Sequence, residues 1–447
     1  MLRIPAILEG EPYHSLDVRA IDGIGGERLA ELTQVPLLKT HALLRAAPEK
    51  LIALLRTPSR QVLDALAQAG ALLRRDEWRF GSLSRPAYVA AVAASTGLPP
   101  ETVGAEIGEM ADLLERMEEI TRVQLPASEE HPLDAHRYAI KGREVGYFPA
   151  GRSLLVKLPG NIPTICVYWL VPLALKRPVV LVPPEEDPFT HLVLVEAIRA
   201  VAPWLAACVQ FLPCEEAVWS RLLDGVDQVI LPQSLARHAR AEKTHLIHYG
   251  RSKLLVCGDW DEAAVGVAAR RMIWNHGRTC TGLTSVIAVR RGRAFAERVA
   301  ERVRSAGPLA LFHPQRARQI DAVIESFVRG GEVEDVTGRP RLLENALLPT
   351  VLWVKQPRSR AFGLELPFPF ITVAEAEDEA RVLELSRDAL VLSVLGGDPE
   401  LLQRLCCDPS IHKVFAGAHA ERGYDPLDPH EGYLADFLYR KKAVRLS

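Results

Sequence analysis

Short runs of β-branched and aliphatic residues alternate with helix-like segments through most of the chain, and this alternation limits the fold more than any other feature. The run 178–182 (Pro-Val-Val-Leu-Val) is apolar throughout and is followed by two prolines, as is typical of a strand inside a parallel sheet. Similar runs lie at 153–157, 208–212 and 228–231, with helix-like segments between them. The pattern predicts a doubly wound α/β domain over 131–252.

A second α/β domain is predicted over 253–416. Its first strand is expected at 253–257, and Asp261 is the expected N-cap of the helix that follows. Before these two domains, residues 1–130 show the three-four spacing of apolar residues that predicts helices, most clearly over 100–119. The last segment, 417–447, is rich in turn residues. Further strands of the second domain are expected at 285–289, 349–354, 370–373 and 391–395.

The composition is that of a globular protein, with 48% hydrophobic and 25% charged residues in 447. A net charge of −2 gives no basic surface for nucleic acid. The seven cysteines include no Cys-x-x-Cys pair, so we expect a reducing compartment and no metal site. Charged residues or prolines interrupt every apolar stretch, and the start resembles no signal peptide. A cytoplasmic protein without a membrane span is therefore expected.

Cys280 is the first candidate catalytic residue. It ends the loop 275–280 (Asn-His-Gly-Arg-Thr-Cys), between a predicted helix and a predicted strand. Loops at a sheet edge expose side chains to ligands. His276 and Arg278 could favour the thiolate, which is the form that attacks carbon. The alternative is an unreactive loop thiol.

Asn161 is the second candidate. It lies in a turn between a strand and a helix, where its amide could donate a hydrogen bond to a developing oxyanion. The alternative is an ordinary helix cap. No glycine-rich phosphate-binding motif follows any predicted strand, so a cofactor would have to bind differently. A glutamate in the loop after 179–182 could accept hydrogen bonds from a ribose, or could simply be solvated.

In this order, the motifs resemble those of the aldehyde dehydrogenase superfamily over about 140–415. The loop 275–280 resembles its nucleophile loop, and Asn161-Ile-Pro163 resembles its Asn-x-Pro oxyanion motif. Segment 182–190 is similar to its cofactor motif, in which Val182 and Pro183 occupy the first positions. Later matches are Pro349-Thr350 and Glu365-Leu-Pro-Phe-Pro369. The resemblance implies two α/β domains, a Cys280 nucleophile, and ribose contacts from Glu185 and Glu365 to NADPH or NADH.

Three departures from the superfamily pattern are informative. The stretch 248–253 (His-Tyr-Gly-Arg-Ser-Lys) lacks the glutamate that activates water in aldehyde dehydrogenases. Val182 replaces the cofactor lysine, and Leu231-Pro-Gln-Ser234 replaces a Phe-Thr-Gly-Ser motif near the cofactor. Without the glutamate, the resemblance implies that the acyl-enzyme exchanges with a thiol and reacts slowly with water.

A narrower resemblance is to the acyl-CoA reductase branch related to the fatty acyl reductase of bacterial bioluminescence (LuxC-like). It rests on Pro159-Gly-Asn-Ile-Pro163, Asp187-Pro-Phe-Thr190, Ser95-Thr-Gly-Leu98 and the helical N-terminal region. It implies reduction of an acyl-CoA or acyl-carrier-protein thioester to an aldehyde. Segments 138–148 and 417–447 resemble the superfamily's oligomerisation arm, which implies a homodimer or a higher homo-oligomer.

Two alternatives remain open from the sequence. A hydrolytic aldehyde dehydrogenase would form an acid from aldehyde and NAD without an added thiol. A superfamily member without turnover would act as a binding subunit, although retention of Cys280, Asn161 and Glu365 argues against it. The sequence does not specify the acyl group, the thiol carrier or the choice between NAD and NADP.

Overall fold

The computed structural model describes residues 2–128, 130–247, 251–309, 311–356, 359–421 and 423–444. The chain forms two compact units. Unit 1 contains residues 1–96, 100–247 and 432–447, and unit 2 contains residues 97–99 and 248–431. Most of regions 1–130 and 131–252, which the sequence analysis separates, therefore lies in one unit, while 97–99 and 248–252 belong to the other. The tail 417–447 is divided between the two units.

Unit 1 is built around a seven-stranded sheet with the order β14-β13-β10-β11-β12-β2-β3. The strands from β14 to β12 are parallel, whereas β2 and β3 are antiparallel. The sheet strands are β2 (Ala6–Leu8), β3 (Glu11–Tyr13), β10 (Leu154–Lys157), β11 (Val179–Val182), β12 (Val209–Phe211), β13 (Gln228–Pro232) and β14 (Thr244–Ile247).

Helices cover this sheet because its strands are apolar on both faces. Leu155, Val180 and Val229 pack with Leu43 of α1 and Trp219 of α10, while α7 and α8 contact β11 and β12. The helices of unit 1 are α1 (Leu37–Arg56), α2 (Ser59–Leu73), α3 (Arg85–Thr96), α4 (Pro100–Glu115), α5 (Met117–Arg122), α6 (Pro132–Ala135), α7 (Val167–Ala174), α8 (Pro188–Val201), α9 (Pro203–Ala206), α10 (Glu216–Gly225) and α16 (Leu434–Leu438), with 3₁₀ turns η1 (Pro163–Cys166) and η2 (Gln233–His238).

The expectation of helices throughout 1–130 is wrong for residues 2–33. This segment forms strands, two of which extend the main sheet at β12, and the helices begin at Leu37. The sheet edge supplies the hydrogen-bonding partners, and a single short strand has no periodicity that would reveal such pairing. The remaining N-terminal strands are β1 (Leu2–Ile4), β4 (Val18–Asp22), β5 (Arg28–Thr33), β6 (Arg79–Phe80) and β7 (Leu83–Ser84).

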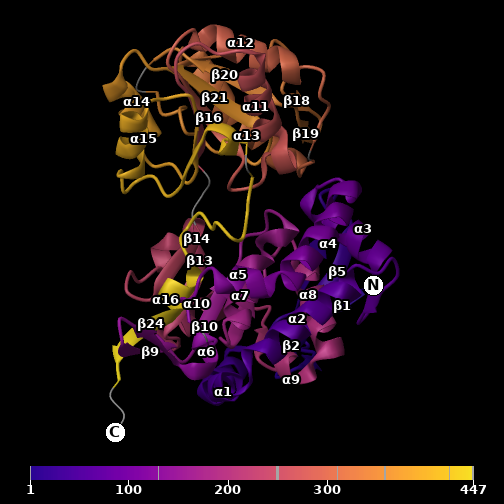
Figure 1. Cartoon of the computed structure of the whole chain (residues 1–447). Helices are drawn as coiled ribbons and strands as arrows, with labels where there is room; N and C mark the ends of the chain where they lie inside the picture. Colours follow the sequence, from indigo (N-terminus) through magenta and orange to yellow (C-terminus); the bar gives the residue numbers. More distant parts are fainter. Residues whose placement is uncertain are drawn as a thin grey trace. The chain divides into compact units, whose positions relative to one another are not determined.

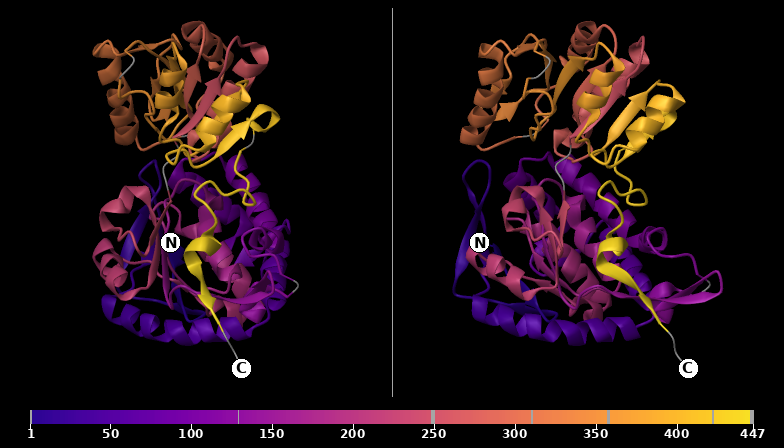
Figure 2. Two further views of the ribbon diagram at one scale, coloured as in Figure 1. Left: turned by 60° about the vertical axis from the view of Figure 1, so that its left-hand side comes forward. Right: turned by 90° about the vertical axis from the view of Figure 1, so that its left-hand side faces the viewer.

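The end of the chain joins a small sheet in unit 1. Strand β24 (Tyr439–Ala443) pairs antiparallel with β9 (Arg143–Pro149), which pairs with β8 (Arg137–Ile140). Figure 2 shows the yellow end of the chain alongside this purple hairpin. The two segments that resemble an oligomerisation arm thus share one three-stranded sheet.

Unit 2 has its own seven-stranded sheet, with the order β17-β20-β21-β16-β15-β22-β23, in which only β17 is antiparallel. Side chains of β15 alternate between its faces: Leu254 and Val256 pack with α11 and α12, and Leu255 packs with α13. Figure 1 labels α11, α12 and α13 among the elements of unit 2, in the salmon and orange part of the chain. The elements of this unit are β15 (Ser252–Val256), α11 (Glu262–Ile273), η3 (Trp274–Gly277), β16 (Leu283–Ala288), α12 (Gly292–Val303), α13 (Pro314–Arg329), β17 (Val333–Asp335), β18 (Leu342–Leu343), β19 (Ala346–Leu347), β20 (Thr350–Val354), β21 (Phe370–Glu375), α14 (Glu379–Ser386), β22 (Leu392–Leu395), α15 (Pro399–Cys406), β23 (Val414–Ala416) and η4 (Gly417–His419).

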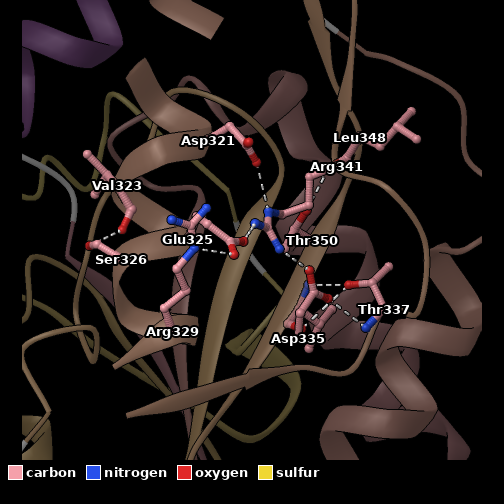
Figure 3. A network of polar contacts seen from close by, with 11 residues as sticks. Asp321, Val323, Glu325, Ser326, Arg329, Asp335, Thr337, Arg341, Leu348 and Thr350 are labelled. Carbon is pink, nitrogen blue, oxygen red and sulfur yellow. Dashed lines mark hydrogen bonds and ion pairs between the residues drawn. The ribbon is translucent and has the colours of Figure 1, made fainter. Parts of the chain in front are cut away.

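A polar network braces the outer part of unit 2. The side chain of Arg341 is only 10% exposed, and its guanidinium contacts three carboxylates, those of Asp321 at 3.1 Å, Glu325 at 2.8 Å and Asp335 at 2.6 Å. Figure 3 shows Arg341 among these carboxylates, with Arg329 on the far side of Glu325. The network ties α13 to β17 and to the segment before β18.

The two α/β units confirm the predicted fold class. Among the described residues, no helix is both long enough and apolar enough to cross a membrane.

Candidate active site

The loop that carries Cys280 has an unusual backbone. Asn275, His276 and Gly277 all have positive φ angles, of 42°, 58° and 69°. At Gly277 this conformation is combined with a close approach, because a Cβ there would lie 2.5 Å from Pro369 N and closer still to the carbonyl group of Phe368. Glycine is therefore the residue that fits, and it holds the loop against the segment before β21.

Two buried side chains hold the peptide groups next to the Cys280 thiol. Ser252 Oγ donates to Cys280 O at 2.9 Å, and Arg271 Nη2 donates to Thr281 O at 3.1 Å. Burial lowers the pKa of Arg271 to about 10. The half-exposed side chain of Cys280 packs against Leu390, Val391 and Phe415.

The basic partner of Cys280 is a residue that the sequence analysis missed. His430 Nε2 lies 3.1 Å from Cys280 Sγ and 3.3 Å from Glu431 Oε2. The side chains of His430 and Glu431 are 2% and 3% exposed. Burial by itself lowers the pKa of His430, but the charges of Cys280 and Glu431, with their hydrogen bonds, raise it to about 10.

Arg278, a neighbour that the sequence suggested as a source of positive charge, has other partners. Its Nη2 donates to Leu311 O at 2.9 Å, and its guanidinium lies 4.7 Å from the centre of the Phe312 ring. His430 follows Cys280 by 150 residues. No local motif marks it, and the one signal available was a His-Glu pair within the turn-rich tail.

Glu365 lies at the same edge of unit 2 as Cys280. Strands β16 and β21 are parallel neighbours, and the two residues come shortly before these strands, so both are at the amino edge of the sheet. The side chain of Glu365 is half-buried. Residues 248–250, at the position of the family's missing glutamate, lie outside the described residues.

Asn161 lies at the carboxyl edge of the unit 1 sheet, in the turn after β10. The chain passes from β10 through β11 to β12 on one side and returns to β13 on the other, which makes β10 the point where ligands usually bind in such sheets. The N-cap of the next helical turn is Ile162, whose own side chain makes no capping hydrogen bond. Asn161 therefore comes one residue before the N-cap position.

The helical N-terminal region supports this turn directly. Glu106 of α4 is 4% exposed, and its carboxylate accepts a hydrogen bond from Thr164 N at 3.1 Å. Burial raises the pKa of Glu106. The start of η1, three residues after Asn161, is thus anchored from a distant part of the chain.

Three predicted cofactor-binding residues, Val182, Pro183 and Glu185, lie at the end of β11 and in the turn after it. Val182 is the buried last residue of β11, and Lys157 is its partner on β10. Lys157 Nζ donates to Pro183 O at 2.7 Å, and burial lowers the pKa of this lysine. A lysine is therefore present here on the neighbouring strand, which the sequence analysis did not recognise.

Glu185 forms an ion pair with Arg19 of β4, at 2.6 Å, and both side chains are about half exposed. The hydrogen bond from Arg19 lowers the pKa of Glu185. The exposed Ser234 lies in η2 after β13, on the other side of β10 from Glu185. Exposed carboxylate, guanidinium and hydroxyl groups at this edge fit the ribose and phosphate groups of a dinucleotide.

The candidates thus form two groups, one in each unit. Unit 1 holds Asn161 and the predicted cofactor residues Val182, Pro183, Glu185 and Ser234. Unit 2 holds Cys280, Glu365 and His430.

Comparison with solved structures confirms the fold. A salicylaldehyde dehydrogenase from Pseudomonas putida G7, complexed with salicylaldehyde, matches with a TM-score of 0.77 at 16% identity, covering 99% of this chain and 97% of that one. Aldehyde dehydrogenase 21 from Physcomitrella patens, in complex with succinate, gives a TM-score of 0.78 at 15% identity, with coverage of 99% and 97%. An NADP-dependent enzyme from E. coli gives 0.78 at 18% identity, with the same coverage.

Comparison with curated protein sequences gives no match. The family model described as "Aldehyde dehydrogenase family" matches residues 16–405, which is most of the chain. We conclude that this chain belongs to the aldehyde dehydrogenase family of oxidoreductases.

Proposed function

We propose that the protein is an acyl-thioester reductase, which forms an aldehyde from an acyl-CoA or acyl-carrier-protein thioester. The observation that carries this proposal is the stretch 248–253, which has no glutamate where the family has its water-activating base. The two side chains of this stretch at 252 and 253 have structural partners: Ser252 donates to Cys280 O, and Lys253 Nζ donates to Leu385 O at 2.7 Å. Neither supplies a carboxylate for activating water.

In the proposed reaction, the Cys280 thiolate attacks the thioester carbonyl and the substrate's thiol leaves. Asn161 and the backbone N–H of Cys280 stabilise the oxyanion, which an amide donor can do by about 3–4 kcal/mol. Glu365 would hold the nicotinamide ribose, and Glu185 the adenosine ribose. A bound reduced nicotinamide supplies the hydride that converts the enzyme thioester to an aldehyde. Val182, Pro183 and Ser234 would line the cofactor site, with Lys157 beside them.

The cofactor could be NADPH or NADH. The Glu185 carboxylate disfavours the 2′-phosphate of NADPH, because like charges repel. Its ion pair with Arg19 acts in the opposite direction, since a guanidinium binds phosphate well. Both cofactors therefore belong in the test.

A hydrolytic aldehyde dehydrogenase is the second candidate, and one observation favours it. His430 lies beside Cys280 and is chemically able to act as a base toward water once the sulfur is acylated. General-base assistance is typically worth about 10²–10⁴ in rate, so hydrolysis of the acyl-enzyme would be measurably faster with such a base than without one.

The test is consumption of NADH or NADPH with a panel of acyl-CoA thioesters of different chain lengths, with aldehyde detected directly. The reverse reaction, from aldehyde and oxidised cofactor, should require coenzyme A or another thiol. Free acid that forms without thiol as fast as thioester forms with it would establish the hydrolytic alternative. If the protein binds the cofactor but shows no turnover either with or without a thiol, it is a binding subunit.

Two variants test the assigned residues. Incubation with acyl-CoA without cofactor should add one acyl group to the protein, and Cys280→Ala should abolish this mass shift. Asn161→Ala should slow acylation by about 10²–10³-fold while the thermal unfolding curve is retained. An adduct on Cys280→Ala, or full acylation by Asn161→Ala, would contradict the assignment.

A further inference from the structure

His430 is placed to exchange a proton with the proposed nucleophile. One nitrogen, Nε2, lies within hydrogen-bond distance of both Cys280 Sγ (3.1 Å) and Glu431 Oε2 (3.3 Å). A single Nε2–H donates best to both acceptors when the sulfur is a thiolate and the glutamate is ionised. The arrangement therefore matches an imidazolium between two anions.

The surroundings of the imidazole favour this charge distribution. The ionisable groups that contact its ring include the Cys280 thiol and the Glu431 carboxylate, and the ring of Tyr424 lies edge-on with its centre 5.7 Å away. Burial leaves little solvent to screen these charges. Two adjacent anionic groups stabilise the imidazolium relative to the neutral imidazole.

We propose that His430 is a catalytic acid–base residue that takes the proton of Cys280 and passes it to the departing sulfur of the substrate. The proton transfer from Cys280 to His430 concerns this chain alone, whereas the transfer to the substrate's sulfur rests on the proposed acyl-thioester reaction. Glu431 is a positioning residue that holds the imidazolium.

The proton and electron pairs balance in this step. The thiolate of Cys280 forms a bond to the acyl carbon, and the carbonyl pair moves to oxygen. When the oxyanion collapses, the bond from carbon to the substrate's sulfur breaks, and this sulfur takes the proton from Nε2. A neutral thiol leaves and His430 becomes neutral, so no oxidant or reductant is consumed in acyl transfer.

The same charges adjust the acidity of His430 to the step. Before attack, the thiolate stabilises the imidazolium. Once the sulfur is acylated its negative charge is gone, so His430 becomes a stronger acid at the moment when the leaving group needs a proton. In the reverse direction the neutral imidazole can accept a proton from an incoming thiol.

The test measures alkylation of Cys280 by iodoacetamide between pH 5 and 9, in the full chain, with each cysteine followed by peptide mass spectrometry. We compare the wild type with His430→Gln, because glutamine keeps a donor near the position of Nε2 but cannot take up a proton. The exposed Cys406 and Cys407 serve as internal controls in every sample.

In the wild type, the alkylation rate of Cys280 should stay nearly constant from pH 8 down to pH 6. In His430→Gln it should fall with pH as the rates of Cys406 and Cys407 do, to at least about tenfold below the wild type at pH 6. Glu431→Gln should shift the profile in the same direction by a smaller amount.

The proposal is overturned if Cys280 of the wild type follows the pH profile of Cys406 and Cys407, a comparison that needs no variant to fold. It is also overturned if folded His430→Gln keeps the wild-type profile. A thiolate profile without any acyl adduct from acyl-CoA would retain the Cys280–His430 pair and refute the proposed function instead.

Discussion

Replacing Gly277 by alanine should both destabilise unit 2 and disturb Cys280. Gly277 has φ +69°, and an added Cβ would lie 2.5 Å from Pro369 N and closer to the backbone carbonyl of Phe368. These neighbours are backbone atoms, which cannot rotate out of the way as a flexible side chain can. Either the loop 275–280 or the segment before β21 must therefore move.

The cost has two parts. A non-glycine residue in the left-handed region costs about 1–2 kcal/mol, and overpacking of a close contact typically costs about 1–3 kcal/mol more. The sum, about 2–5 kcal/mol, corresponds to a fall in melting temperature of roughly 5–15 °C for a domain of this size. Gly258→Ala is the matched control, because Gly258 has φ +77° and no atom within 4 Å of its added Cβ.

Thermal unfolding of both variants and iodoacetamide labelling of Cys280 measure these effects. We expect Gly258→Ala to lose only about 1–2 kcal/mol and to label normally, while Gly277→Ala loses more and labels at an altered rate. Equal melting temperatures for the two variants, with unchanged labelling, would refute the argument that close approach fixes this loop.

Three further predictions concern stability and assembly. Arg341→Met leaves three carboxylates without their cation and should lower the free energy of unfolding in urea by about 3 kcal/mol, whereas Arg329→Met, at a 78% exposed side chain, should change it little. Burial lowers the pKa of His191 to about 3. The imidazole therefore takes up a proton below about pH 6.5 in the unfolded chain but stays neutral in the folded one. The free energy of unfolding should be highest above pH 6.5 and should fall by about 2 kcal/mol between pH 7 and pH 5. His191→Asn keeps an acceptor for Trp169 Nε1 and should lose this contribution, so an unchanged slope would contradict the assignment. Light scattering should give a multiple of the 49.4 kDa chain mass, and a monomer mass across micromolar concentrations would exclude the proposed oligomer.

The sequence predicted most of the elements that position the site. The strands at 179–182, 252–256 and 283–288, and the Asp261 cap of α11, lie where the apolar runs and the capping signal placed them. The predicted loop between α11 and β16 carries Cys280. These features are local, since burial imposes an apolar pattern on each strand and a cap needs only a few neighbouring residues.

The residues that surround the candidate site were decided by the tertiary structure. His430 reaches Cys280 across 150 residues, and Arg19 reaches Glu185 across 166. Lys157 lies beside Val182 only because β10 and β11 are adjacent and in register. Each of these contacts depends on which elements pack together, and the order of the strands and the burial of whole sheets determine that packing. The residues next to a side chain in the sequence do not indicate this packing. The sequence therefore determined the candidate nucleophile and its loop, while the fold determined which base lies beside the nucleophile.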